Sequence, residues 1–454
     1  MIFLGVSLFV AAALVLLLMA VVGVMRQQVS SIAFAALSGY AWVAALTVDS
    51  LVDQFGVEGY FLGALVYVIG SVSLALSTWL FATRATARRL AMPEWGETDF
   101  TLYSRFALVL GASCLVLLVL SRDDLLVNWS EARSESGPLT VLAAFFLLLA
   151  CPGIVAAWLA KRPLAAIVLF ALCATSFVLL GSRAALLCAL VFALWIMLVR
   201  ARGIAPKLRV LALAAIAGFA VHVLLRQVRG LGIGGLLQAL DEGNLLATLF
   251  SADVNADLSG GELAIPKYFL FSTRVSSVDD FGFMSSIQRV LLLPVPRIEG
   301  WFDKPVDVTY LLWEKAYEAG LFSDAEGQAT LLDSYLSGSL GSLHPTLFGE
   351  YFLAGGWISL LLSTTFLGAT FSIIDETMRR MNRLTSLALC GPLLVGYLFV
   401  ARGNSVIGLG YFFYLGIIFS VMQLLANQGA KLQRGFFAGQ PFRQRSPTTR
   451  RASV

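Results

Sequence analysis

Stretches of about twenty apolar residues recur along almost the whole chain, and they constrain its fold more than any other feature. The hydrocarbon core of a bilayer is about 30 Å thick, so a helix that crosses it needs roughly 20 apolar residues. Of the 454 residues, 58% are hydrophobic and only 13% are charged, whereas soluble domains carry about 25% charged residues. The sequence therefore predicts an all-α polytopic membrane protein.

The apolar stretches predict eleven transmembrane helices. They lie at about 2–24, 31–50, 60–82, 101–120, 141–160, 163–181, 184–200, 210–228, 346–372, 384–401 and 405–426. The first stretch has no cationic segment before it and no clear cleavage site, so we interpret it as a span and not as a signal peptide. Eight helices thus occupy residues 1–229 and three occupy residues 345–426, followed by a basic tail at 427–454 that we expect to be disordered.

The connection over residues 230–344 is much longer than the others. A structureless loop of this length is improbable in a compact protein. Its apolar pieces are broken by Gly and Pro, which predicts short helices that cover one face of the membrane as a cap.

Positive charge in the short loops predicts the orientation. Nineteen Lys and Arg residues fall in one alternating set of loops and the tail, against four in the other set. Lys and Arg stay on the cytoplasmic side. We therefore expect the amino terminus and the long connection outside the membrane, and the carboxyl terminus inside it.

All five cysteines lie inside apolar stretches. Buried cysteines of this kind behave as small hydrophobic residues, and we expect no disulfide and no thiolate metal site. No Asp-rich or His-rich metal motif occurs either, so the sequence predicts no metal and no cofactor. Nothing in it predicts a nucleic-acid partner.

Several arginines lie at the outer ends of the expected helices. Arg183 follows Gly181 and Ser182 in a tight outer turn, and Arg402 lies in another. Arg226 and Arg229 share one helix face with His222, because they are spaced by three, four and seven residues. Each arginine could extend into the headgroup layer or bind an anion, and His222 is also typical of a buried hydrogen-bond donor.

Arg274, in the long connection, is a weaker candidate for anion binding. It lies in FSTRVSSVDD, where a salt bridge to Asp279 or Asp280 would explain it equally well. We keep both interpretations.

His344 and Glu350 precede the ninth apolar stretch in the motif HPTLFGE. Proline is favoured as the first residue of a helix, so we expect His344 at or just before the cap. The partial positive charge of that helix end disfavours imidazolium. Either His344 or Glu350 could serve as a general base, and which of them accepts the proton is left open.

The expected outer face thus collects arginines, a histidine and a glutamate. Arginine suits phosphate because its planar fork donates to two oxygens at once. A lipid-linked pyrophosphate in the outer leaflet would lie at the same depth. The residues predict transfer chemistry in which the arginines stabilise a departing pyrophosphate.

The order of these motifs resembles the Wzy-type family of O-antigen and capsule repeat-unit polymerases, which is related to the O-antigen ligases. The resemblance rests on GSR at 181–183, RQVR at 226–229, HPTLFGEYFLAGG at 344–356 and RG at 402–403. Family members often have twelve or more spans, whereas we expect eleven. The resemblance implies a GT-C-like, metal-independent, inverting glycosyltransferase.

The resemblance also implies the substrates. A growing glycan would move from one undecaprenyl diphosphate carrier to a second lipid-linked repeat unit at the periplasmic face, in the biosynthesis of lipopolysaccharide or another polysaccharide. A chain-length regulator would be a candidate partner. Two alternatives stay open, a glycan ligase with the same donor and a flippase for lipid-linked oligosaccharides. A flippase should place polar groups near the bilayer midplane.

Overall fold

In the computed structural model of the chain, the described residues are helical almost throughout. The structure describes residues 1–85, 95–120, 138–180, 183–201, 265–276, 308–318 and 344–405, with a few single positions in 203–243 and 408–417. Helices make up 90% of this part of the chain, and no strand occurs in it. The expectation of an all-α fold is confirmed.

Thirteen helices are described. They are α1 (Ile2–Met25), α2 (Ser31–Leu46), α3 (Val48–Ala85), α4 (Glu97–Leu120), α6 (Pro138–Ala150), α7 (Pro152–Leu159), α8 (Pro163–Leu180), α9 (Arg183–Arg200), α13 (Ile265–Val275), α15 (Val308–Glu318), α17 (Thr346–Leu353), α18 (Gly356–Arg380) and α19 (Arg383–Arg402).

Six helical stretches of the described part are long and apolar enough to cross a membrane. They are Ile2–Met25, Val48–Ala82, Glu97–Leu120, Leu142–Leu159, Gly356–Arg380 and Arg383–Arg402. Three shorter apolar helices, at Ser31–Leu46, Pro163–Phe177 and Leu187–Arg200, coincide with three more of the expected spans. The spans expected at 210–228 and 405–426 lie almost entirely outside the described residues.

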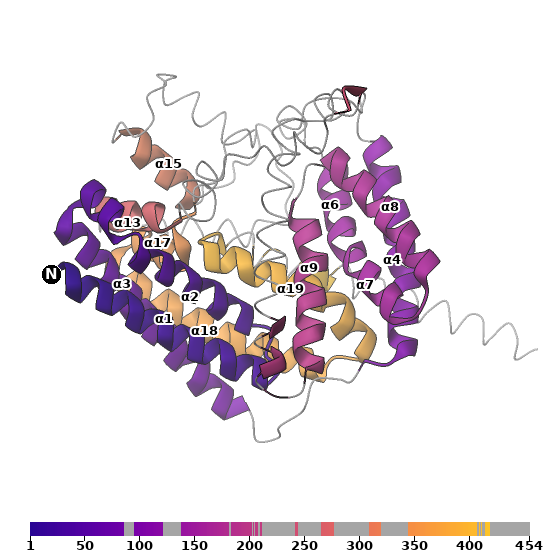
Figure 1. Cartoon of the computed structure of the whole chain (residues 1–454), viewed down its shortest axis with the longest axis horizontal. Helices are drawn as coiled ribbons and strands as arrows, with labels where there is room; N and C mark the ends of the chain where they lie inside the picture. The colour runs from indigo at the N-terminus through magenta and orange to yellow at the C-terminus, as the bar shows by residue number, and fades with distance from the viewer. Residues whose placement is uncertain are drawn as a thin grey trace, which may run out of the picture.

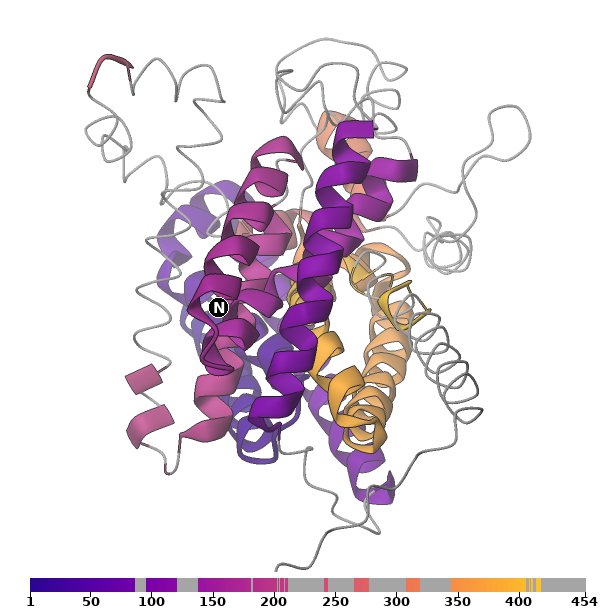
Figure 2. The same ribbon diagram turned by 90° about the vertical axis from the view of Figure 1, so that its right-hand side faces the viewer.

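The helices form two groups joined through α9 and α19 (Figure 1). In one group α1 packs on α2 and α3, and α3 packs on α18. In the other, α4 packs on α6, α7 and α8. Figure 2, seen from the side of α4 and α8, shows the long helices running broadly alongside one another. This is the arrangement of a helical membrane bundle.

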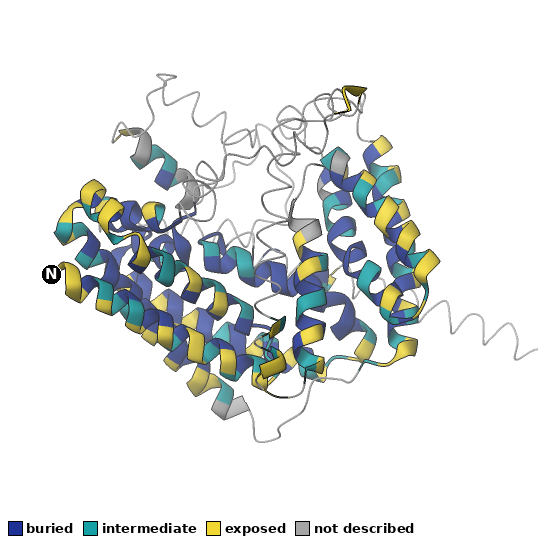
Figure 3. Ribbon diagram, viewed as in Figure 1, coloured by how far each residue is buried: buried dark blue, intermediate teal, exposed yellow. Residues whose placement is uncertain are grey.

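The outward faces of the bundle are apolar. Exposed residues follow the outer sides of the helices, whereas buried residues lie between them (Figure 3). Among the exposed side chains are Leu18 at 64%, Ile167 at 64% and Phe366 at 70% exposed. A soluble protein rarely exposes so much contiguous apolar surface, but a bilayer accepts it without cost. Burial therefore supports a membrane-embedded protein independently of hydropathy.

The single helix expected over 346–372 is wrong, because the chain forms two helices there. Gly355 and Gly356, at φ 156° and 61°, adopt backbone conformations that residues with a Cβ rarely reach. They separate α17 from α18. Consequently the spanning helix begins at Gly356. Both titratable residues of the HPTLFGE motif lie before it, His344 just before the short helix α17 and Glu350 within α17.

Two short helices of the long connection are described, α13 and α15. Helix α13 packs against α17 and α3, and α15 also contacts α17. Phe269 of α13 joins a cluster of aromatic rings with Phe9, Tyr67 and Phe348. The connection is thus anchored to the bundle through the helix that carries Glu350.

Two basic loops that the charge count assigns to the same side of the membrane lie together, one with Arg26 and one with Arg379. Arg379 donates a hydrogen bond to the backbone oxygen of Arg26, at 3.0 Å. Glu376 forms salt bridges to Arg379 at 3.8 Å and to Arg380 at 2.9 Å. The residue before Glu376, Asp375, accepts hydrogen bonds from the backbone N–H and the hydroxyl of Ser30, which is the N-cap residue of α2.

Candidate functional site

The local backbone at the start of α17 is unusual. Pro345 is the N-cap residue and Thr346 is the first helical residue, so Pro345 was placed one position too far into the helix by the sequence. Thr346 has a φ of 63°, so the chain turns at this residue as it enters the helix. A positive φ costs a residue with a Cβ about 1–2 kcal/mol, so surrounding contacts must hold Thr346 in place.

Those contacts come from the end of α19. Helix α19 ends at Arg402, and Gly403 follows in the left-handed conformation with φ 87°, as is common for glycine after a helix. A Cβ on Gly403 would lie 2.7 Å from the carbonyl carbon of Thr346 and 2.9 Å from its nitrogen. The two backbones are therefore in direct contact, and this contact brings the RG and HP motifs together.

Glu350 strengthens the same contact between α17 and the chain after α19. Its side chain is 4% exposed and accepts hydrogen bonds from the Ser405 backbone N–H, at 3.1 and 3.3 Å, and from the Ser405 hydroxyl, at 2.5 Å. Hydrogen bonds to a buried carboxylate are among the stronger ones in proteins. Glu350 thus ties α17 to the chain that follows α19, and we refer to this contact as the Glu350–Ser405 clamp.

His344 has different surroundings. The residue is 6% exposed, and its Nδ1 atom has no hydrogen-bond partner within the described part of the chain. Burial, and secondarily the positive charge of Arg402, lower the pKa of His344 from 6.5 to about 3. The imidazole is therefore neutral near pH 7. The expectation that imidazolium is disfavoured agrees with this shift, although burial is the larger cause.

Arg402 supplies the positive charge of this site. Its side chain is half-buried, and its guanidinium carbon lies 5.9 Å from the ring centroid of Phe399, one turn earlier on α19. A planar guanidinium held beside a ring can still donate to a phosphate through its outer edge. The site therefore places a neutral imidazole close enough to a guanidinium for the positive charge to affect its pKa, at one end of the bundle.

Arg274 lies on α13, next to α17. Its side chain is exposed, while the neighbouring Ser276 hydroxyl donates to the backbone oxygen of Phe352 at 2.8 Å. The α13 helix also packs Ser272 against Gly349. Arg274 therefore belongs to the helix pair that carries the site, whereas Asp279 and Asp280, its alternative partners, lie outside the described residues.

The remaining sequence candidates are described incompletely or not at all. Arg183 is the first residue of α9, and its side chain lies outside the described part. Arg226, Arg229 and His222 are also outside it. Among the described residues, no group of three or more His, Cys, Asp or Glu could hold a metal ion.

Sequence reasoning did not single out Ser405 or Thr346 as residues of the site, and it noted Gly403 only as part of the RG motif. Glycine directly after an apolar helix is a recognised C-terminal signal, so RGNS indicates the end of a helix. It does not indicate which distant backbone the glycine will meet. The Glu350–Ser405 clamp likewise joins residues 55 positions apart, which no local pattern specifies.

The comparisons with known proteins add no further identification. No protein-family model, no curated protein and no solved structure matches this chain.

Proposed function

We propose that the chain is a glycosyltransferase that polymerises undecaprenyl-diphosphate-linked oligosaccharide repeat units at the periplasmic face of the bacterial inner membrane. The observation that carries the proposal is the neutral, buried imidazole of His344, with an open hydrogen-bonding position, in the electrostatic field of Arg402. This pair suits a reaction that takes a proton from a hydroxyl while an anion departs.

In the proposed reaction, a hydroxyl oxygen of the acceptor sugar attacks the anomeric carbon of the donor glycan from the side opposite to its diphosphate. The new carbon–oxygen glycosidic bond forms as the bond from that carbon to the phosphate oxygen breaks. The electron pair leaves with the lipid diphosphate, and the hydroxyl proton passes to the imidazole of His344. Attack from the opposite side inverts the anomeric configuration.

The anion and the base assist each other in this scheme. Burial is the larger cause of the lowered pKa of His344, and the charge of Arg402 is the smaller one. A diphosphate bound at Arg402 would offset the second cause and raise the pKa of the imidazole, in the direction that favours a general base. The histidine would thus be a stronger base when the donor is bound.

The hydrogen bonds of Glu350 favour a positioning role for this residue over that of the base. Both of its oxygens accept from Ser405, whereas the Nδ1 atom of His344 is open. A carboxylate in such a clamp would have to give up strong hydrogen bonds before it could take a proton.

The distribution of charge along α18 and α19 disfavours a flippase. In α18 the charged residues are Asp375, Glu376, Arg379 and Arg380, all in the last two turns. In α19 they are the first and last residues, Arg383 and Arg402. A transporter should place such groups near the bilayer midplane, and the middle of both helices is free of charge.

Reconstitution of the purified chain in vesicles with undecaprenyl-diphosphate repeat units tests the proposal. Polymer on the lipid carrier is the expected product, without added metal. Transfer only to a different glycan acceptor would indicate a ligase. Movement of the repeat unit across the bilayer without a new glycosidic bond would indicate a flippase, and either outcome would overturn the polymerase assignment.

Replacement of the site residues tests the mechanism in the same assay. His344→Ala and Arg402→Ala should each lower the rate at least about 100-fold, the usual contribution of a general base or of one charge-stabilising group. Single repeat units should persist. Arg379→Ala, at the opposite end of the bundle, is the matched control and should leave the rate of polymerisation within a few-fold. Normal polymer from both site variants would exclude this mechanism.

A further inference from the structure

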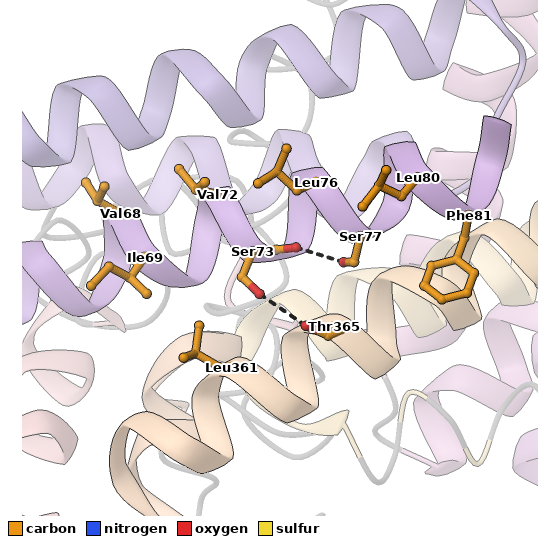
Figure 4. Close-up of a pocket in the computed structure, with 10 residues that line it drawn as sticks. All are labelled: Val68, Ile69, Val72, Ser73, Leu76, Ser77, Leu80, Phe81, Leu361 and Thr365. Atoms are coloured by element: carbon orange, nitrogen blue, oxygen red, sulfur yellow. Dashed lines mark hydrogen bonds between the residues drawn. The ribbon is translucent and has the colours of Figure 1, made fainter. Parts of the chain in front are cut away.

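A groove runs along the membrane-facing side of the bundle between α3 and α18. It encloses about 500 Å³ and is lined mainly by aliphatic side chains of α3, with Leu361 and Thr365 of α18 opposite (Figure 4). Its rim residues Val72, Leu76 and Leu80 are 39%, 53% and 46% exposed. Because both walls belong to helices that can cross a membrane, the groove opens to hydrocarbon.

The two helices touch at several points along the floor of the groove. Gly368 lies against Ser77 and Thr78, where a Cβ would come within 2.8 Å of the Thr78 nitrogen. Just beyond, the Ser372 hydroxyl donates to the Thr78 carbonyl at 2.8 Å. Nearer the beginning of α18, the Thr365 and Ser73 hydroxyls lie 3.4 Å apart. The groove therefore lies along the outer side of a line of close contacts between α3 and α18.

The polar atoms of the groove floor are satisfied by the helices themselves. The Thr364 hydroxyl donates to the Leu360 carbonyl at 2.7 Å and lies 2.9 Å from the Ser73 hydroxyl. Ser77 donates to the Ser73 carbonyl at 2.8 Å. Hydroxyls that are already paired make little demand on a ligand, so an apolar chain can lie over them without leaving them unsatisfied.

The end of the groove that Val68 and Ile69 line adjoins the helix of the candidate site. Ile69 lines the groove, and its neighbour Gly70 lies under the ring of Phe348, where a Cβ would be 2.9 Å from the ring carbon Cγ. Phe348 is two residues before Glu350 on α17. On α18, the groove residue Leu361 comes five residues after Gly356, the first residue of the helix. This is about 7–8 Å along a helix that rises 1.5 Å per residue, so the groove begins close to α17.

We propose that this groove holds the first isoprene units of the polyprenyl chain of the lipid-linked substrate, with its diphosphate at the α17 end. The inference rests on the proposed function. About 500 Å³ admits a segment of a single hydrocarbon chain, whereas a helix about 10 Å across cannot enter it. The α17 end also directs the lipid head towards His344 and Arg402.

Site-specific photocrosslinking tests the occupant directly. Benzoylphenylalanine is introduced at Leu361, which lines the groove, or at Leu362, which is 61% exposed but does not line it. The full chain is reconstituted in vesicles of phosphatidylethanolamine and phosphatidylglycerol that contain a small fraction of undecaprenyl diphosphate. Adducts are identified by mass spectrometry.

Position 361 should yield polyprenyl adducts at least tenfold above their share of the bilayer, and position 362 should yield phospholipid in bulk proportion. Phospholipid in bulk proportion at both positions, or crosslinks to a second copy of the chain from position 361, would overturn the proposal. This readout does not depend on polymerisation. Polyprenyl adducts from a protein that makes no polymer would support the groove and overturn the proposed function. Polymer without polyprenyl adducts would support the proposed function and overturn the proposed role of the groove.

Matched substitutions give a second measurement. Leu361→Trp should fill the groove and raise KM for the lipid-linked donor about tenfold while kcat is retained. Leu362→Trp adds the same side chain to the same helix and should change neither constant. Equal KM values for the two variants would contradict a substrate role of the groove.

Discussion

A histidine that is kept neutral by its surroundings makes folding depend on pH. The pKa of His344 is lowered from 6.5 to about 3, first by burial and then by Arg402. Between these two values the unfolded chain binds a proton that the folded chain does not bind. The free energy of unfolding therefore falls as the pH is lowered from about 6.5 towards 3.

We predict that this fall amounts to about 1.4 kcal/mol per pH unit inside the window. Thermal midpoints of the wild type and of His344→Asn, measured in detergent between pH 7.5 and 4, should diverge as the pH is lowered. Subtraction of the two curves removes the titration of the other groups. A constant difference over this range would contradict the burial of a neutral imidazole.

Gly403 is a second residue whose identity is dictated by its surroundings. Gly403→Ala would force a Cβ into the backbone of Thr346 at a φ that alanine disfavours. We expect a loss of more than about 2 kcal/mol in stability, together with loss of polymerisation. Gly39→Ala is the control, because a Cβ there meets nothing within 4 Å and should be neutral or stabilise α2 by up to about 1 kcal/mol.

At the scale of elements, two buried carboxylates each hold a segment that is distant in the sequence. Glu350 binds Ser405 at one end of the bundle, and Asp375 binds the N-cap residue Ser30 at the other. Unpaired N–H groups at a helix start need acceptors, and here the acceptors come from α17 and α18. Both contacts are buried, so each joins two elements that would otherwise meet only through apolar packing.

The clamp can be distinguished from a catalytic carboxylate by comparing both of its partners. If Glu350 only positions α17, then Glu350→Gln and Ser405→Ala should lower the thermal midpoint by similar amounts. They should also lower the rate of polymerisation by similar factors. A double-mutant cycle between Glu350→Ala and Ser405→Ala should give a coupling of about 1.5–3 kcal/mol. Loss of activity in Glu350→Gln with an unchanged midpoint, beside an active Ser405→Ala, would instead identify Glu350 as the base.

Sequence patterns predicted some elements and missed others for physical reasons. Hydropathy predicted α1, α4 and α19 closely, because a span is defined by composition over a length that the bilayer sets. It missed the break before α18, since the apolar residues continue through Gly355 and Gly356. Loop charges predict that His344 and Arg402 lie on the same side of the membrane, whereas their proximity depends on how α17 packs against the end of α19.

At the scale of the whole molecule, orientation is the most direct prediction to test. The five native cysteines are at most 1% exposed and should not react with a membrane-impermeant maleimide. Asp49→Cys lies in the first turn of α3, just after α2, at an end that we expect outside. Lys161→Cys lies in a basic loop that we expect inside. In intact cells the reagent should label position 49 only, and position 161 should be labelled after the membrane is opened. The reverse pattern would invert the topology.

The contact between Asp375 and Ser30 also sets an order for biosynthesis. These residues are 345 positions apart, and a chain emerges from the ribosome with its amino terminus first. The first three helices must therefore enter the membrane and wait, with the start of α2 still uncapped, until α18 is translated. The Glu350–Ser405 clamp beside His344 forms later still, after Ser405 is translated. A nascent chain that stops before Ser405 already carries the histidine, but it lacks the partner that fixes α17, so the assembled site is a product of the last stage of synthesis.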